Sequence, residues 1–90
     1  MIKSLLVRLL LISFLIISPL LAVAAEALPL FSSEQSAQQH CPSDVVVWLN
    51  LPTGIYHLQG ERWYGRTKNG AFVCKAEADQ AGDRETRNGQ

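Results

Sequence analysis

Three short runs of hydrophobic residues, separated by turn-forming residues, follow one another in the C-terminal half of the chain. Residues 45–49 are β-branched and aromatic and predict a strand. A turn containing proline and glycine follows, and residues 55–58 predict a second strand that pairs with the first as a hairpin. Residues 71–74 predict a third short strand. Residues 75–81 are good helix formers, with Gly82 placed to end the helix.

This order of elements predicts a small α+β domain, built from a β-hairpin, a third short strand and one short C-terminal helix. The residues expected to form its core are Val46, Trp48, Ile55, Phe72, Val73 and Ala78. Side chains alternate between the two faces of a strand. An error of one residue in the strand assignment therefore exchanges the residues expected to be buried with those expected to be exposed.

The first 25 residues have a different pattern. Lys3 and Arg8 give a positive start, residues 9–21 form an apolar run, and residues 22–24 are small. The run is shorter than the roughly 20 apolar residues that a membrane span needs. We therefore predict a cleaved signal peptide over residues 1–25 and an exported protein, periplasmic or secreted. The alternative is an uncleaved N-terminal anchor. Contact with the membrane is expected only through this segment, before cleavage.

Two further segments lack hydrophobic periodicity and are predicted to be flexible, which leaves residues 40–84 as the folded domain. Residues 26–39 are rich in serine, glutamine and alanine and predict a flexible tether. The alternative is that the apolar side chains of this segment dock on the domain, namely Leu28, Leu30 and Phe31. Residues 85–90 have no large apolar side chain and predict a disordered tail.

The chain contains two cysteines, Cys41 and Cys74. In an oxidising compartment an even pair is most simply a disulfide, and so small a domain needs such a cross-link. Closing a loop of about 34 residues removes about 3.8 kcal/mol of unfolded-state entropy. A metal-binding pair and free thiols are the alternatives.

The chain that follows the leader is slightly acidic. Its six basic side chains are Arg62, Arg66, Lys68, Lys75, Arg84 and Arg87. Its eight acidic side chains are Glu26, Glu34, Asp44, Glu61, Glu77, Asp79, Asp83 and Glu85. Nucleic-acid-binding domains normally carry a basic surface, so we expect no nucleic-acid partner.

The pattern N-x-x-T-G-I-Y-H-x-x-G-x-x-W-Y, over residues 50–64, resembles the opening of the small bacterial sunset domains. These domains are similar to the N-terminal zinc domain of the Ada methylphosphotriester-repair protein. The resemblance covers residues 48–84 and continues through Phe72, the Glu77-Ala78 pair and Gly-x-Arg at 82–84. The stretch W-Y-G-x-T-x-x-G-x-F-x-C also resembles small exported bacterial proteins of unknown function. The resemblance implies an Ada-like fold.

The zinc ligands of those relatives do not carry over. Their thiolates follow the glycine of Y-H-x-x-G and the final Gly-x-Arg, where this chain has Glu61 and residues 85–88. The side chains left as possible ligands are His40, Cys41, His57 and Cys74, with no C-x-x-C or H-x-x-x-H pair. Structural zinc usually takes four Cys or His ligands. We therefore predict no metal, no cofactor and no DNA-repair activity.

An aromatic and basic cluster is the candidate binding site. Its members are His57, Arg62, Trp63, Tyr64, Arg66 and Lys68. Aromatic rings beside guanidinium groups stack on sugars, bases or peptide side chains. The alternative for the rings is that one completes the core while the other covers a turn. The alternative for His57 is a structural hydrogen bond.

No serine, cysteine or carboxylate pair stands in a recognised catalytic relation to His57, so no catalytic residue is predicted. We expect a non-catalytic exported module that binds an unknown protein, a peptide or a cell-envelope glycan. One alternative is a small histidine- or metal-dependent enzyme that uses His57 with Glu61. A weaker alternative is a nucleic-acid-binding remnant of an Ada-like domain.

Overall fold

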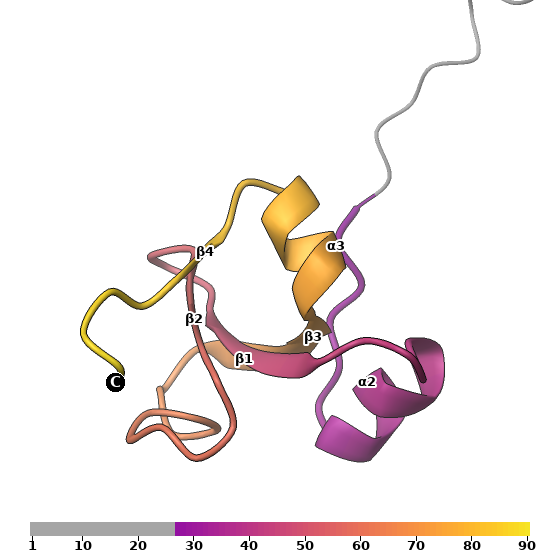
Figure 1. The fold of residues 1–90 in the computed structure, drawn as a ribbon, viewed down its shortest axis with the longest axis horizontal. Helices are drawn as coiled ribbons and strands as arrows, with labels where there is room; N and C mark the ends of the chain where they lie inside the picture. The colour runs from indigo at the N-terminus through magenta and orange to yellow at the C-terminus, as the bar shows by residue number, and fades with distance from the viewer. Residues whose placement is uncertain (1–26) are drawn as a thin grey trace, which may run out of the picture.

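The computed structural model describes residues 27–90, which form one mixed β-sheet flanked by two short helices (Figure 1). In chain order the elements are α2 (Glu34–His40), β1 (Val46–Asn50), β2 (Ile55–His57), β3 (Gly70–Cys74), α3 (Lys75–Gln80) and β4 (Arg84–Glu85). Within residues 27–90, no helix is long and apolar enough to cross a bilayer. The predicted signal peptide lies outside the described residues.

The four strands lie in the order β3-β1-β2-β4. The central strand β1 pairs antiparallel with both neighbours, so that Trp48 lies opposite His57 on one side and Phe72 on the other. The turn of the β1–β2 hairpin closes where the Gly54 N–H donates to the Asn50 carbonyl at 3.0 Å. Gly54 has a φ of +70°, which glycine adopts without strain. The predicted hairpin, third strand, C-terminal helix and α+β class are confirmed.

The sheet is buried on both faces at β1, which explains where the predicted core is wrong. The main apolar cluster lies on the face under α3 and comprises Val47, Leu49, Tyr56, Ala71, Val73 and Ala78. Val46 and Trp48 are also buried, but on the opposite face. Ile55 and Phe72, both predicted as core, are only half-buried. A central strand covered on both sides has no polar face, so alternation does not reveal which set faces the larger cluster.

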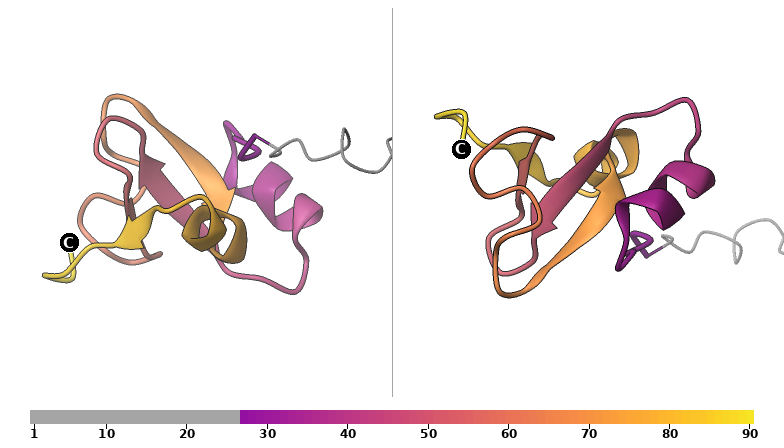
Figure 2. Two further views of the ribbon diagram at one scale, coloured as in Figure 1. Left: turned by 90° about the horizontal axis from the view of Figure 1, so that it is seen from above. Right: turned by 90° about the horizontal axis from the view of Figure 1, so that it is seen from below.

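The connection between β2 and β3, residues 58–69, lies over the face opposite α3 (Figure 2). Its Tyr64 ring packs edge-on against Phe72 at 5.6 Å, and Phe72 packs edge-on against Trp48 at 4.9 Å. A side chain at Gly70 would collide with the Trp48 ring. Glycine at this position therefore lets the indole lie flat against β3.

The predicted tether over residues 26–39 is wrong where the chain forms α2. Ser33 caps this helix by accepting a hydrogen bond from the Ser36 N–H at 3.1 Å, and Ala37 is fully buried. Before α2, Phe31 exchanges two backbone hydrogen bonds with Phe72, at 3.0 and 2.9 Å. Leu28 packs on the core, whereas Leu30 is 51% exposed. The docking alternative is therefore confirmed for Leu28 and Phe31.

The predicted disulfide between Cys41 and Cys74 is confirmed. It joins the C-terminal end of α2 to the last residue of β3, and the Cys74 side chain is fully buried. The bond therefore holds α2 against the sheet.

The predicted disordered tail over residues 85–90 is also wrong, because β4 runs parallel to β2. The Arg84 N–H donates to the Gly54 carbonyl and the Thr86 N–H to the Tyr56 carbonyl, both at 3.0 Å. Backbone hydrogen bonds, and not apolar side chains, hold this segment in place. The hydrophobic pattern of the sequence therefore gives no sign of β4.

Candidate ligand-binding cavity

A cavity of about 500 Å³ lies between the β1–β2 hairpin, the β2–β3 connection and the C-terminal segment. Four of the six predicted site residues line it, namely His57, Trp63, Arg66 and Lys68. The other lining residues, which the sequence did not indicate as site residues, are Asn50, Thr53, Ile55, Thr67, Thr86, Asn88 and Gln90.

Hydrogen bonds fix the β2–β3 connection as one wall of this cavity. The Trp48 indole N–H donates to the Thr67 hydroxyl at 2.7 Å, and the Glu61 carboxylate accepts the Leu58 N–H. Gly65 supports the turn with a φ of +71°. A wall held in this way loses little conformational freedom when a ligand binds.

Trp63 is the aromatic member of the cavity. Its side chain is 37% exposed, and its backbone N–H donates to the Gln90 main-chain oxygen at 2.9 Å, which joins the connection to the C-terminal segment. The Arg62 guanidinium lies over the indole, 4.9 Å from the ring centroid. Arg62 therefore supports Trp63 without lining the cavity itself.

Tyr64 faces away from the cavity and has a structural role. Its hydroxyl donates to the Glu34 carboxylate of α2 at 3.0 Å, and its ring packs on Phe72. Burial, and secondarily the hydrogen bond to Glu34, raise the pKa of Tyr64 above its usual range. The two adjacent rings therefore differ in role: Tyr64 packs on the sheet, whereas Trp63 is partly exposed and lines the cavity.

His57 lies in β2 with only 7% of its surface exposed, opposite Trp48. Its Nδ1 atom is buried and has no hydrogen-bond partner among the described residues. A buried polar atom without a partner is costly and needs an explanation. Among residues 27–90, His57 is the one buried polar or charged residue, and it also lines the cavity.

The described side chains that line the cavity include two cations and no acids. Arg66 and Lys68 contribute positive charge, while the described lining residues include no aspartate, glutamate, serine or cysteine. Three carboxamides and three threonines add hydrogen-bonding groups. This composition contrasts with the acidic balance of the chain that follows the leader.

The opposite face of the sheet carries a separate polar network. The Tyr56 hydroxyl donates to the Asp79 carboxylate at 2.6 Å, and the Lys75 ammonium donates to it at 2.9 Å. The hydrogen bonds from Tyr56 and Lys75 lower the pKa of Asp79. Burial, and then the bond to Asp79, raise the pKa of Tyr56. This network fastens α3 to β2 and does not reach the cavity.

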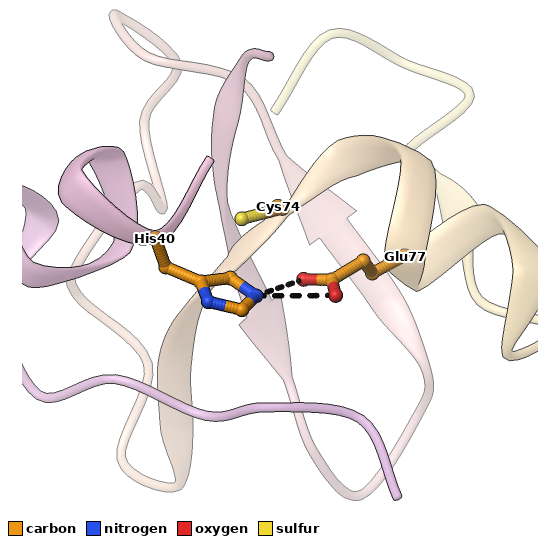
Figure 3. A group of neighbouring side chains, drawn as sticks. All are labelled: His40, Cys74 and Glu77. Carbon is orange, nitrogen blue, oxygen red and sulfur yellow. Dashed lines mark hydrogen bonds and ion pairs between the residues drawn. The ribbon is translucent and has the colours of Figure 1, made fainter. Parts of the chain in front are cut away.

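A third group, formed by His40, Cys74 and Glu77, lies where α2, β3 and α3 meet (Figure 3). The His40 Nε2 atom is 3.1 and 3.2 Å from the two Glu77 carboxylate oxygens. The ligand atoms of the three residues all lie within 4.8 Å of one another. His57, another histidine considered as a zinc ligand from the sequence, is not in this group.

Comparison of the chain with protein-family models, with curated proteins and with solved structures finds no match. The resemblance to sunset and Ada-like domains therefore stays a prediction that rests on the sequence pattern.

Proposed function

We propose that the protein is a non-catalytic binding module of the bacterial cell envelope that takes an anionic glycan in its cavity. The observation that carries this proposal is the joint lining by Trp63, Arg66 and Lys68, with no aspartate or glutamate among the described lining residues. An exposed indole stacks on the apolar face of a sugar ring. The two cations pair with a carboxylate or phosphate on that sugar.

The remaining lining residues supply hydrogen-bonding groups that a sugar ligand would use. The carboxamides of Asn50, Asn88 and Gln90 both donate and accept hydrogen bonds, as the hydroxyls of a sugar require. A volume of about 500 Å³ lies within the range of small-molecule sites.

The cavity lacks the groups that would cleave such a ligand. Most glycoside hydrolases place the side chains of two aspartates or glutamates on either side of the scissile bond, and the described lining residues include neither residue type. Glu61, the expected partner of His57 in an enzyme, is outside the lining and accepts a backbone N–H. These features favour binding over catalysis.

A disulfide in a small domain is more typical of exported proteins than of cytosolic ones. Together with the leader pattern of residues 1–25, it supports the proposal that the protein is exported. Mass measurement of protein from the exported fraction should show a chain that starts at Ala25 or Glu26. Full-length chain retained in membranes would contradict cleavage.

The test of the proposed function is calorimetric titration of the oxidised protein with a uronic-acid oligosaccharide and with a neutral oligosaccharide of equal length. We expect binding of the acidic sugar alone. Arg66→Gln should weaken it by tenfold or more, since one charge-assisted hydrogen bond contributes about 1.5–3 kcal/mol. Trp63→Ala should also weaken it, because it removes the ring on which the sugar stacks. The matched control is Lys75→Gln, which removes one positive charge on the far face.

Two results would count against the proposal. Equal affinity for the acidic and neutral sugars, or equal weakening by Lys75→Gln and Arg66→Gln, would show that the cavity is not the anion site. Tighter binding of a hexaglutamate peptide than of the uronic-acid oligosaccharide would identify an acidic peptide, and not a glycan, as the ligand class.

A further inference from the structure

We propose that reduction of the Cys41–Cys74 disulfide turns the junction of α2, β3 and α3 into a zinc site, with His40, Cys41, Cys74 and Glu77 as its ligands. This inference is independent of the cavity and of its ligand. In the oxidised protein the same residues form a covalent cross-link beside a hydrogen bond between His40 and Glu77.

The geometry of the junction already gathers three of the four ligand atoms. His40 is the last residue of α2, Cys74 ends β3, and Glu77 lies in the first turn of α3. Figure 3 shows the His40 ring and the Glu77 carboxylate facing each other, with the Cys74 sulfur beside them. Cys41 follows His40 in the chain and is bonded to Cys74. Its sulfur is the fourth ligand and lies outside the group of three gathered atoms, so it reaches the metal by rotation of its side chain after reduction.

Two contacts orient the ring and the carboxylate. The His40 ring packs against Phe31, with 5.2 Å between the centroids, and its Nε2 is 3.1 Å from a Glu77 oxygen. Zinc bonds of about 2.0–2.3 Å place two tetrahedral ligands roughly 3.3–3.8 Å apart. The three measured ligand atoms, all within 4.8 Å of one another, need to move by about 1 Å or less.

The oxidation state of the sulfurs decides whether this site binds metal. A disulfide sulfur carries no negative charge, whereas thiolates are the sulfur ligands that zinc prefers. With the bond intact, His40 and Glu77 are left as two ligands without a thiolate. With the bond reduced, two thiolates, one imidazole and one carboxylate complete a tetrahedral set.

The chemical steps balance with a dithiol as reductant. The dithiol gives two electrons and two protons to the Cys41–Cys74 bond and becomes a disulfide itself, leaving two protein thiols. Zinc binding then releases both thiol protons to solvent and exchanges the hydrogen bond between His40 and Glu77 for two metal bonds. The metal joins the same two elements that the disulfide joined, so it keeps α2 against the sheet in the reduced protein.

The experiment compares the oxidised protein with protein reduced by a phosphine, using Co²⁺ as a spectroscopic probe and Zn²⁺ as the competitor. We expect one Co²⁺ per reduced chain, with thiolate-to-cobalt charge-transfer bands that zinc abolishes, and no such bands in oxidised protein. Zinc at one hundred times its dissociation constant should raise the melting temperature of the reduced protein by roughly 10–20 °C.

Three variants separate the proposed site from binding by two thiols alone. His40→Ala and Glu77→Gln should each lower zinc affinity at least tenfold in the reduced protein, while Glu85→Gln on β4 should leave it unchanged. Equal affinity in all three variants would overturn the four-ligand site. Absence of charge-transfer bands would also overturn it, as would a reduced protein that stays unfolded by circular dichroism at saturating zinc.

Discussion

Replacing either cysteine with alanine should remove a large part of the stability of the oxidised domain. The two cysteines are 33 positions apart. By closing this loop, the bond lowers the entropy of the unfolded chain, which stabilises the fold by about 3.8 kcal/mol. Strain in the native state and residual structure in the unfolded state usually reduce such values. We therefore expect each variant to lose between half of this free energy and all of it. The total stability of a small domain is about 5 kcal/mol at the low end.

The structure predicts that the two single variants differ slightly. Cys74 is fully buried, so Cys74→Ala also leaves a small cavity, which adds about 1 kcal/mol. Cys41 is half-buried, and its replacement adds less. At about 4–8 °C per kcal/mol, loss of the bond alone should lower the melting temperature of both variants by roughly 8–30 °C, and Cys74→Ala should melt at the lower temperature of the two.

Thermal and urea unfolding followed by circular dichroism would measure these differences, after a thiol assay has shown that the parent is fully oxidised. The double variant should be no less stable than Cys74→Ala, because both substitutions delete the same bond. Destabilisations that add in the double variant would refute this reasoning. Free thiols in exported protein isolated without reductant would refute it at the start.

Three further predictions concern the packing around the sheet. Tyr64→Phe removes the hydrogen bond to Glu34 and, at this partly exposed position, should lower the free energy of unfolding by about 1 kcal/mol, measured by urea denaturation. An unchanged midpoint would show that the bond contributes nothing. The lowered pKa of Asp79 means that its contribution is complete above its ordinary value of 3.8 and is lost as the pH falls through its lower folded value. In Asp79→Asn the free energy of unfolding should therefore fall less steeply below about pH 4 than in the parent protein. The same pH dependence in both proteins would contradict the role given to this carboxylate. Gly70→Ala should destabilise by about 1–3 kcal/mol because the new methyl group collides with the Trp48 ring, and a variant that melts with the parent would contradict that close packing.

The strands were predictable where the sequence has a strong local signal. The β-branched run that becomes β1 and the glycine-containing turn after it indicate a hairpin without tertiary information. The assignment of faces was not predictable, because β1 is buried on both sides and offers no alternation to read. Helix α2 was missed because its stability depends on one cap, at Ser33, and on one buried alanine, Ala37, which are weak signals in a serine- and glutamine-rich segment.

The candidate site was predicted in part for similar physical reasons. Aromatic and basic residues between glycines indicated the β2–β3 connection as a binding site. Because Trp63 and Tyr64 are adjacent, the sequence does not tell which ring packs on the sheet and which lines the cavity. The third wall, formed by Thr86, Asn88 and Gln90, carries no apolar or charged signal. The backbone pairing of β4 with β2 and the hydrogen bond from the Trp63 N–H to the Gln90 main-chain oxygen bring it to the cavity.

The most direct test of the anionic-glycan site is a residue-resolved NMR titration of the oxidised protein with the uronic-acid oligosaccharide. The proposal predicts that the Trp63 indole and the Arg66 and Lys68 amides shift together and saturate, while Tyr56 and Ala78 on the far face stay fixed. Saturating shifts confined to α3, or no shifts at millimolar sugar, would contradict it.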